Sequence, residues 1–175
     1  MNIFITEDIS NTTANRVLQE ILKVREAEIE KEKSIINVHI NSHGGDLEAG
    51  YAIYDILRLS GYTINTFAIS EVFSSAIIIY LAGDSRYATN YSSFMIHEPR
   101  HEYDKDDKDS MSANTYRRNL KELQIATNEY YKLISKHTTL TPQQLKNFCS
   151  NGRDCYFKTQ EAKKWGLVTN VGIPI

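Results

Sequence analysis

Two adjacent serines, Ser74 and Ser75, stand at the start of an apolar run in the segment SEVFSSAIIIYLAG, residues 70–83. A serine just before an apolar helix is commonly an N-cap, which stabilises the helix by roughly 1 kcal/mol. It is instead a nucleophile when a histidine base and an orienting carboxylate reach its hydroxyl in a cleft. The sequence offers His97, in FMIHEPRH, and Asp154, in GRDCYF, as these partners. Taken singly, each has an ordinary interpretation as a structural histidine or a turn residue.

A pair of glycines follows an expected strand in the segment INSHGGDLEAG, residues 40–50. Paired glycines let the backbone approach a ligand closely and present its N–H groups. Such donors at a strand-to-helix corner suit an oxyanion or a phosphate. The segment lacks the Gly-Lys-Ser/Thr of a phosphate-binding loop. By itself it indicates a tight turn, with anion binding as the alternative.

The segment from His97 to His101 matches H-E-x-x-H, the zinc-binding pattern of metalloproteases. That pattern works only on a helix, where both histidines share one face. Pro99 lies inside it, and proline costs about 3 kcal/mol in a helix interior. Residues 94–96 also have the character of a strand. Zinc hydrolysis is therefore disfavoured, no metal or cofactor is expected, and His97 is expected at a strand end, where it can reach a cleft.

The length and composition are those of a single globular domain covering residues 1–175. The chain is 41% hydrophobic and 24% charged, which is ordinary for such a domain. Its formal net charge of −2 gives no reason to expect nucleic acid or an anionic membrane as partner. The apolar run of residues 76–82 is too short to cross a bilayer, and the acidic first ten residues do not resemble a signal peptide. Cys149 and Cys155 indicate neither a zinc site nor a disulfide framework, so a cytoplasmic protein is expected.

Strands alternate with helices along the chain, which predicts an α/β fold with parallel pairings and right-handed crossovers. Apolar periodicity, caps and turn residues delimit these elements. The expected strands are residues 2–5, 35–40, 63–69, 86–88, 94–97, 153–157 and 167–171. The expected helices are residues 11 or 12 to about 31, 47–59, about 74–83, roughly 111–135, 142–149 and 159–165. Residues 102–109 contain five acids and two lysines and are expected to form an exposed loop.

Three segments occur together in one order and at characteristic separations: INSHGGDLEAGYAIYD, SSAIIIYLAG followed by FMIHEP, and GRDCYFKTQEAKKWGLV. Together they resemble the Clp protease proteolytic subunit family, ClpP, over nearly the whole chain. The family has INSPGG followed by AG-x-AIYD, then a serine entering an apolar helix and MIHQP or MIHEP, then R-D-x-x-F/Y and a Y/W-GL-V ending. The resemblance implies the ClpP/crotonase fold, an α/β spiral of β-β-α units with a long protruding handle helix.

The same resemblance implies a serine endopeptidase that hydrolyses unfolded proteins or peptides inside a homo-oligomer of heptameric rings, which can stack in pairs. Carried over by position, Ser74 is the nucleophile, His97 the base and Asp154 the third member of the triad. Gly45 and Ser75 match the positions whose backbone N–H groups form the oxyanion hole. One such donor typically contributes roughly 2.7–4 kcal/mol to transition-state stabilisation.

The chain departs from the family pattern around the matched site. His43 stands where proline is usual, and Phe73 and Ala76 stand where small residues and a glycine surround the nucleophile. Phe73 is expected to narrow the mouth of the site and to change substrate preference. The acidic segment beginning at Arg100 replaces the glycine-rich segment that lines the substrate and helps to pair two rings. Ring stacking and substrate pairing are therefore expected to be sensitive to pH or salt.

Coupling to a Clp-type ATPase is not expected. The chain begins at the first strand without the family's axial loops, and Asn37 and His39 stand where ATPase-docking tyrosines are common. A stand-alone peptidase or a phage-type ClpP-like protease is the expected form. Two alternatives stay open: a catalytically inactive ring subunit that keeps the fold, and a crotonase-type acyl-CoA enzyme, which does not need the three catalytic residues together.

Overall fold

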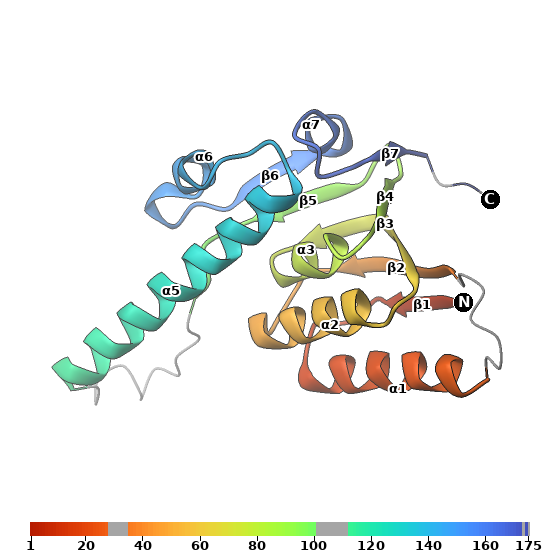
Figure 1. Ribbon diagram of the computed structural model, residues 1–175. Helices are drawn as coiled ribbons and strands as arrows, with labels where there is room; N and C mark the ends of the chain where they lie inside the picture. Colours follow the sequence, from red (N-terminus) through yellow and green to blue (C-terminus); the bar gives the residue numbers. More distant parts are fainter. Residues whose placement is uncertain (28–34, 101–111, 173, 175) are drawn as a thin grey trace.

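A mostly parallel β-sheet forms the centre of the fold in the computed structural model, which describes residues 1–27, 35–100, 112–172 and 174 (Figure 1). Five strands lie side by side, each parallel to its neighbour, in the order β1 (Asn2–Ile5), β2 (Ile35–Ser42), β3 (Thr63–Phe73), β4 (Ser85–Ala88) and β7 (Asn170–Val171). The predicted α/β fold is confirmed. One pairing in the sheet is not parallel, because β6 (Cys155–Lys158) runs antiparallel to β5 (Ser93–Ile96).

Strand β3 is long enough to pair with two different strands on the same side. Its first half pairs with β4, from Asn65 opposite Ser85 onward, and its last three residues pair with β5. The sequence predicted that this strand would end at residue 69. The structure extends it to Phe73, because Val72 and Phe73 find a partner strand in β5. The carboxyl ends of β3 and β5 therefore lie next to each other.

Helices α1 (Asn11–Ala27), α2 (Leu47–Leu59) and α3 (Ser75–Tyr80) pack side by side on one face of the sheet (Figure 1). The other helices are α5 (Ala113–His137), α6 (Pro142–Phe148), which packs on α5, and α7 (Thr159–Lys164), which packs near β5 and β6. The 25 residues of α5 begin after the N-cap Ser112, whose side chain accepts a hydrogen bond from Thr115 N–H, and the helix extends away from the sheet in Figure 1. Among the helices of the described residues, none combines the length and the apolarity that crossing a membrane requires.

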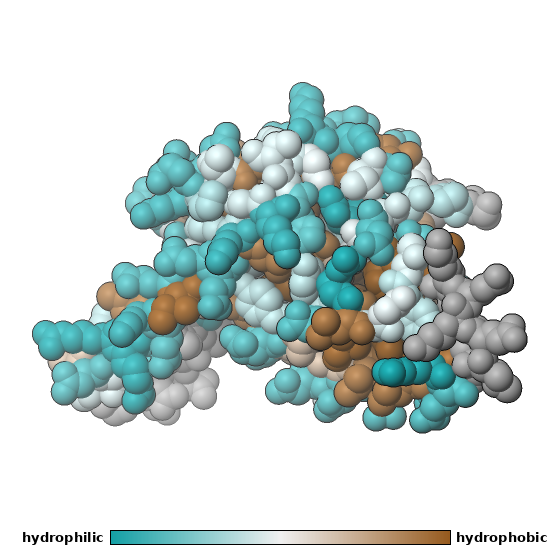
Figure 2. Space-filling model, viewed as in Figure 1, coloured by the Kyte–Doolittle hydropathy of each residue, from teal (hydrophilic) through white to brown (hydrophobic). Residues whose placement is uncertain are grey.

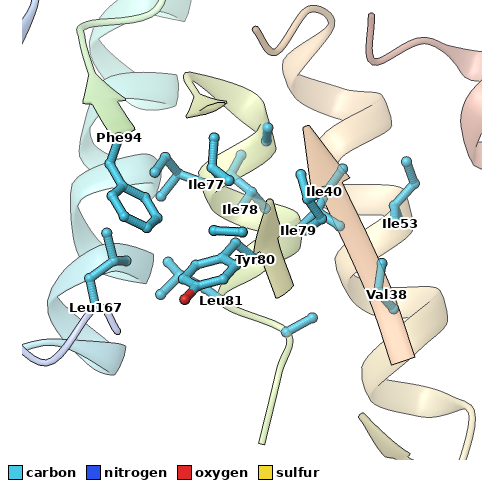
Figure 3. Packing of buried hydrophobic residues seen from close by; sticks show 14 of the residues in the cluster. Val38, Ile40, Ile53, Ile77, Ile78, Ile79, Tyr80, Leu81, Phe94 and Leu167 are labelled. Atoms are coloured by element: carbon cyan, nitrogen blue, oxygen red, sulfur yellow. The ribbon is translucent and has the colours of Figure 1, made fainter. Parts of the chain in front are cut away.

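Helix α3 lies at the centre of the hydrophobic core (Figure 3). All six of its residues are buried, which is the pattern of a helix that is covered on every side. Figure 3 shows Ile77 to Tyr80 between Val38 and Ile40 of β2 and the side chains of Phe94 and Leu167. Burying one such side chain contributes roughly 1.5–3 kcal/mol. This packing fixes the position of the residue that immediately precedes α3.

The opposite face of the sheet carries a row of stacked rings. Ring centroids are 4.9 Å apart from Phe4 to His39, 4.8 Å from His39 to Phe67 and 4.9 Å from Phe67 to Tyr87. The parallel register places these residues in line, because Phe4 pairs with His39, His39 with Phe67 and Phe67 with Tyr87. Asn37 lies on the same face and accepts a hydrogen bond of 3.2 Å from the side chain of Asn65.

The remaining boundaries differ from the sequence predictions by a few residues. The last strand has only two residues instead of the five predicted, because the N–H groups of Leu167 and Val168 bond to Ala162 O at the end of α7. Thr141 begins α6 with the predicted cap and with Pro142 at the first helical position. The predicted end of the first helix near residue 31 and the predicted acidic loop at 102–109 lie outside the described residues.

Candidate active site

Ser74 lies between the end of β3 and the start of α3, in a backbone conformation that is rare for residues other than glycine. Its φ is 54° and its ψ is −125°, and its side chain makes no capping hydrogen bond. Ser74 therefore occupies the N-cap position of α3, but its side chain does not cap the helix. Its backbone is held from two sides, since its N–H donates to Met95 O at 2.9 Å and the Tyr130 hydroxyl donates to its carbonyl at 3.0 Å. Such a conformation costs of order 1–3 kcal/mol and persists only where the surroundings impose it.

His97 follows the end of β5 and meets Ser74 directly. Its Nε2 lies 2.7 Å from Ser74 Oγ, a hydrogen-bonding distance. The strand pairing explains the approach, because Phe73 is in register with Met95 and each side chain leaves its strand shortly after that pair. The structure therefore brings together the first two residues of the predicted site.

Asp154 lies on the other side of His97, but farther away. Its Oδ1 is 3.8 Å from His97 Nδ1, which is beyond hydrogen-bonding distance. The same oxygen forms an ion pair and a hydrogen bond with the Arg100 guanidinium. His97 Nδ1 is buried and has no hydrogen-bond partner among the residues that the structure describes. The third predicted residue is thus present at the site without a direct hydrogen bond to the histidine.

The surroundings of His97 lower its pKa below the ordinary value of 6.5. Burial is the largest cause, because it disfavours the charged imidazolium. The Arg100 guanidinium lowers the pKa further, while the Asp154 carboxylate opposes both effects. The imidazole is therefore neutral at pH 7, the form that can accept a proton.

The two glycines of the HGG segment lie against the serine. A Cβ on Gly44, whose φ is +100°, would stand 2.7 Å from both Phe73 O and Ser74 Cβ, so only glycine fits there. Gly44 O and Asp46 N bond to Ile9 at 2.8 Å each. In a bridge of this kind Gly45, which lies between Gly44 and Asp46, directs its own N–H to the side opposite Ile9.

Ser75 is only 1% exposed, and its hydroxyl has no hydrogen-bond partner within the described part of the chain. Its Cβ packs against Gly50 of α2, where an added Cβ would lie 3.2 Å away. Ser75 can therefore contribute to the site only through its main chain, which begins α3.

Ser74, His97 and Asp154 open onto one groove of about 1000 Å³. The predicted site residue Gly45 lines it as well. The other lining residues are His43, Asp46, Leu47, Glu48, Met95, Pro99, Arg100, Glu122, Leu123, Ala126 and Tyr130. These come from the N-terminal end of α2, the strand ends and the middle of α5. The groove has the size and the mixed polar and apolar lining of a site for an extended chain or a small molecule.

Phe73 does not occupy the position that the sequence suggested. It is 9% exposed and is covered by the His43 ring, with centroids 5.5 Å apart, and by the edge of Tyr156. His43 Nε2 in turn lies 2.7 Å from a carboxylate oxygen of Glu71. Among the described residues, His43 and not Phe73 lines the groove.

The zinc pattern does not form the helix that it requires. Residues 97–100 follow β5 in an irregular conformation, and His101 lies outside the described residues. No cluster of three metal-binding side chains is found in the described portions of the chain.

Comparison with known proteins decides the family. Residues 1–174 match the sequence pattern of the Clp protease family. The chain belongs to the Clp protease family. An ATP-dependent Clp protease proteolytic subunit from Porphyromonas gingivalis is 28% identical over 171 residues, which are 97% of this chain and 72% of the relative. The solved structure of a ClpP1 mutant from Listeria monocytogenes has a TM-score of 0.83 and 24% identity, covering 99% of this chain and 91% of the other.

Three residues of this Clp protease family site were not identified from the sequence. Gly44 was visible as half of a glycine pair, but only coordinates show that it, rather than Gly45, packs on the serine. Tyr130, which bonds to the Ser74 carbonyl, follows that serine by 56 positions and has no local signal. Arg100 stood next to the matched HEP motif, but its pairing with Asp154 depends on a segment 54 positions away.

Proposed function

We propose that this Clp protease family member is a serine endopeptidase acting on peptides or unfolded proteins, with Ser74, His97 and Asp154 as its catalytic residues. The observation that carries the proposal is the distance of 2.7 Å between Ser74 Oγ and His97 Nε2 at the wall of a groove. A serine is a weak nucleophile unless a base takes its proton, and a neutral imidazole at this distance is such a base.

In the proposed reaction, Ser74 Oγ attacks the peptide carbonyl while its proton passes to His97 Nε2. The imidazolium then donates that proton to the leaving amine, and a water molecule repeats the sequence on the acyl-enzyme. Asp154 stabilises the imidazolium when its carboxylate reaches Nδ1. The negative charge on the tetrahedral intermediate faces the N–H groups of Gly45 and Ser75, the proposed oxyanion hole. The direction of the Gly45 N–H inferred from its bridge to Ile9 supports this role.

The groove supports a peptide as substrate. Its lining includes backbone from the HGG segment and apolar side chains from α2, β5 and α5: Leu47, Met95, Leu123 and Ala126. An extended peptide can place its main chain along the glycine segment and its side chains against this apolar lining.

Assembly into a ring-shaped homo-oligomer is part of the proposal. Three large apolar side chains of α5 are exposed, Tyr116 at 66%, Leu120 at 50% and Ile125 at 49%. Figure 2 shows a brown hydrophobic patch in the otherwise mostly teal surface along this helix. Exposed apolar surface of this kind is typical of an interface between subunits. Sedimentation velocity tests the assembly, and a monomer at all concentrations would contradict it.

Labelling with a fluorophosphonate tests the catalytic proposal. The reagent should modify Ser74, as mapped by mass spectrometry, and labelling should be lost in Ser74→Ala and in His97→Ala. Ser75→Ala is the matched control, since it removes a neighbouring hydroxyl that does not face the groove and should leave labelling intact. Peptide hydrolysis should fall by up to about 10⁶-fold in Ser74→Ala. Labelling that persists in folded Ser74→Ala would overturn the assignment.

One observation favours a second candidate, a ring subunit that keeps the fold without hydrolysing peptides. This observation is the gap of 3.8 Å between His97 Nδ1 and Asp154. An absence of both labelling and hydrolysis in the assembled wild-type protein would select that candidate.

A further inference from the structure

One carboxylate oxygen at the site lies between two competing partners. Asp154 Oδ1 is paired with the Arg100 guanidinium, while His97 Nδ1 is 3.8 Å from the same atom. A hydrogen bond to His97 needs the oxygen to come roughly 1 Å closer. Side-chain exposure is 50% for Arg100 and 33% for Asp154. An ion pair this exposed is weak and readily exchanged for another partner.

Arg100 also binds the backbone of the loop that carries Asp154. Its guanidinium donates to Gly152 O at 3.0 Å, in addition to Asp154. The turn at residues 150–152 is held in left-handed backbone conformations, with φ of 61° at Asn151 and 69° at Gly152. Arg100 thus contacts both the carboxylate and the main chain that leads to it.

The buried nitrogen of His97 shows what this arrangement leaves unsatisfied. Nδ1 has no hydrogen-bond partner in the described residues, and a buried polar atom without a partner is unfavourable. A turn of the Asp154 carboxylate away from Arg100 would supply that partner. That turn would give a second arrangement of the Asp154 side chain, and only this second arrangement would complete the hydrogen-bonded sequence from serine to histidine to aspartate.

We infer that Arg100 is a positioning residue that withholds Asp154 from His97, so that the site rests with its third catalytic residue disengaged. The inference rests on the proposed function and adds a control to that same site. Exchange of the guanidinium to another acceptor, or its removal, lets the carboxylate engage Nδ1. Arg100 itself touches neither the nucleophile nor the base by hydrogen bond.

The test compares Arg100→Gln with Arg58→Gln in the full-length protein. Arg58 is a matched control, because it also forms an exposed ion pair with an aspartate, Asp84. Two quantities are measured: the rate of fluorophosphonate labelling at Ser74 and the pKa of His97 by NMR. The charged groups that act on His97 are Arg100 and Asp154, while the acids that line the groove are Asp46, the N-cap of α2, Glu48 of α2 and Glu122 of α5.

Arg100→Gln should raise the labelling rate by about tenfold, because a hydrogen bond to the charged imidazolium contributes a factor of that order. It should also raise the His97 pKa, since a cation is lost and a carboxylate is gained. Arg58→Gln should leave both quantities as in the wild type. In an Asp154→Asn background, the added Arg100→Gln change should no longer accelerate labelling.

The outcomes separate this inference from the proposed function. A slower or unchanged labelling rate in Arg100→Gln overturns the inference, because Arg100 would then support Asp154 or be indifferent to it. A raised His97 pKa that depends on Asp154, without labelling of any variant, supports the inference and refutes the peptidase. If Arg100→Gln fails to fold, Arg100→Lys takes its place. Lysine keeps the charge but lacks the fork that holds Gly152 and Asp154 together, so a smaller rise is expected.

Discussion

Ser74 Oγ and His97 Nε2 lie 2.7 Å apart although 23 positions separate the residues in the chain. The contact arises from the sheet. Strand β5 pairs with the last three residues of β3, and Ser74 N–H bonds to Met95 O directly beyond that pairing. The carboxyl ends of two parallel strands lie at the same edge of a sheet. Ser74, which follows β3, therefore meets His97, which follows β5.

The reactivity of Ser74 should depend on pH through the protonation of His97. Burial and Arg100 lower the pKa of His97 below 6.5, and only the neutral imidazole can accept the serine proton. The labelling rate should therefore rise with pH and reach half of its maximum below pH 6.5. Stopped samples analysed by mass spectrometry between pH 4.5 and 8 measure this profile. A midpoint above 6.5 would contradict it.

Replacing Gly44 should damage both stability and reactivity. Gly44→Ala introduces a Cβ 2.7 Å from Phe73 O and Ser74 Cβ at a φ of +100°. We expect a loss of about 2–4 kcal/mol in the free energy of unfolding, from backbone strain and overpacking, together with loss of Ser74 labelling. Gly61→Ala is the control, because Gly61 has a φ of +84° and open space around it. Gly61→Ala should lower the free energy of unfolding by about 1–2 kcal/mol and leave the labelling of Ser74 unchanged. Urea denaturation measures the free energy of unfolding of both variants, and equal losses would disprove the steric argument.

Arg86 should contribute more to stability than an exposed arginine does. Its side chain, in a residue only 8% exposed, donates to four backbone carbonyls: those of Gly83, His137, Gly166 and Leu167. Arg86→Met leaves these acceptors buried without their donor and should lower the free energy of unfolding by about 2–4 kcal/mol. Arg58→Met, at an exposed ion pair, should cost about 1 kcal/mol or less. Similar losses in the two variants, measured by urea denaturation, would refute this prediction.

His137 should make the folded state less stable in mild acid. Burial, aided by Arg86, Lys136 and Arg58, lowers its pKa to about 4 from the ordinary 6.5. Between these values the unfolded chain binds more protons than the folded one, so stability falls as the pH decreases from 6.5 toward 4.

His137→Gln tests this expectation by removing that titration. The wild type should lose on the order of 1 kcal/mol more than the variant between pH 7 and pH 5, after allowance for partial exposure. Carboxylates with lowered pKa values, such as those of Glu7 and Asp84, are present in both proteins and cancel in the comparison. Urea denaturation at the two pH values gives the difference, and parallel pH dependences would reject the assignment.

The sequence predicted the α/β class, most helix and strand boundaries to within about two residues, and the family, because periodicity, caps and glycines are local and the three matched segments keep their order. The cap and proline of α6 and the full span of α2 are examples. It misplaced the C-terminal end of β3 and the start of the last strand, since these depend on whether a distant strand or the end of α7 supplies hydrogen-bond partners.

By itself, the sequence determined which side chains could do chemistry: one hydroxyl, one imidazole and one carboxylate in matched motifs. Only the tertiary structure decided how they meet. It brings Ser74 and His97 into contact through the pairing of β3 and β5, and it pairs Asp154 with Arg100 while leaving the carboxylate 3.8 Å from His97 Nδ1. The physical reason is that these distances are set by packing between segments that are distant in the chain, 23 positions apart for Ser74 and His97 and 54 for Arg100 and Asp154, which no local pattern encodes.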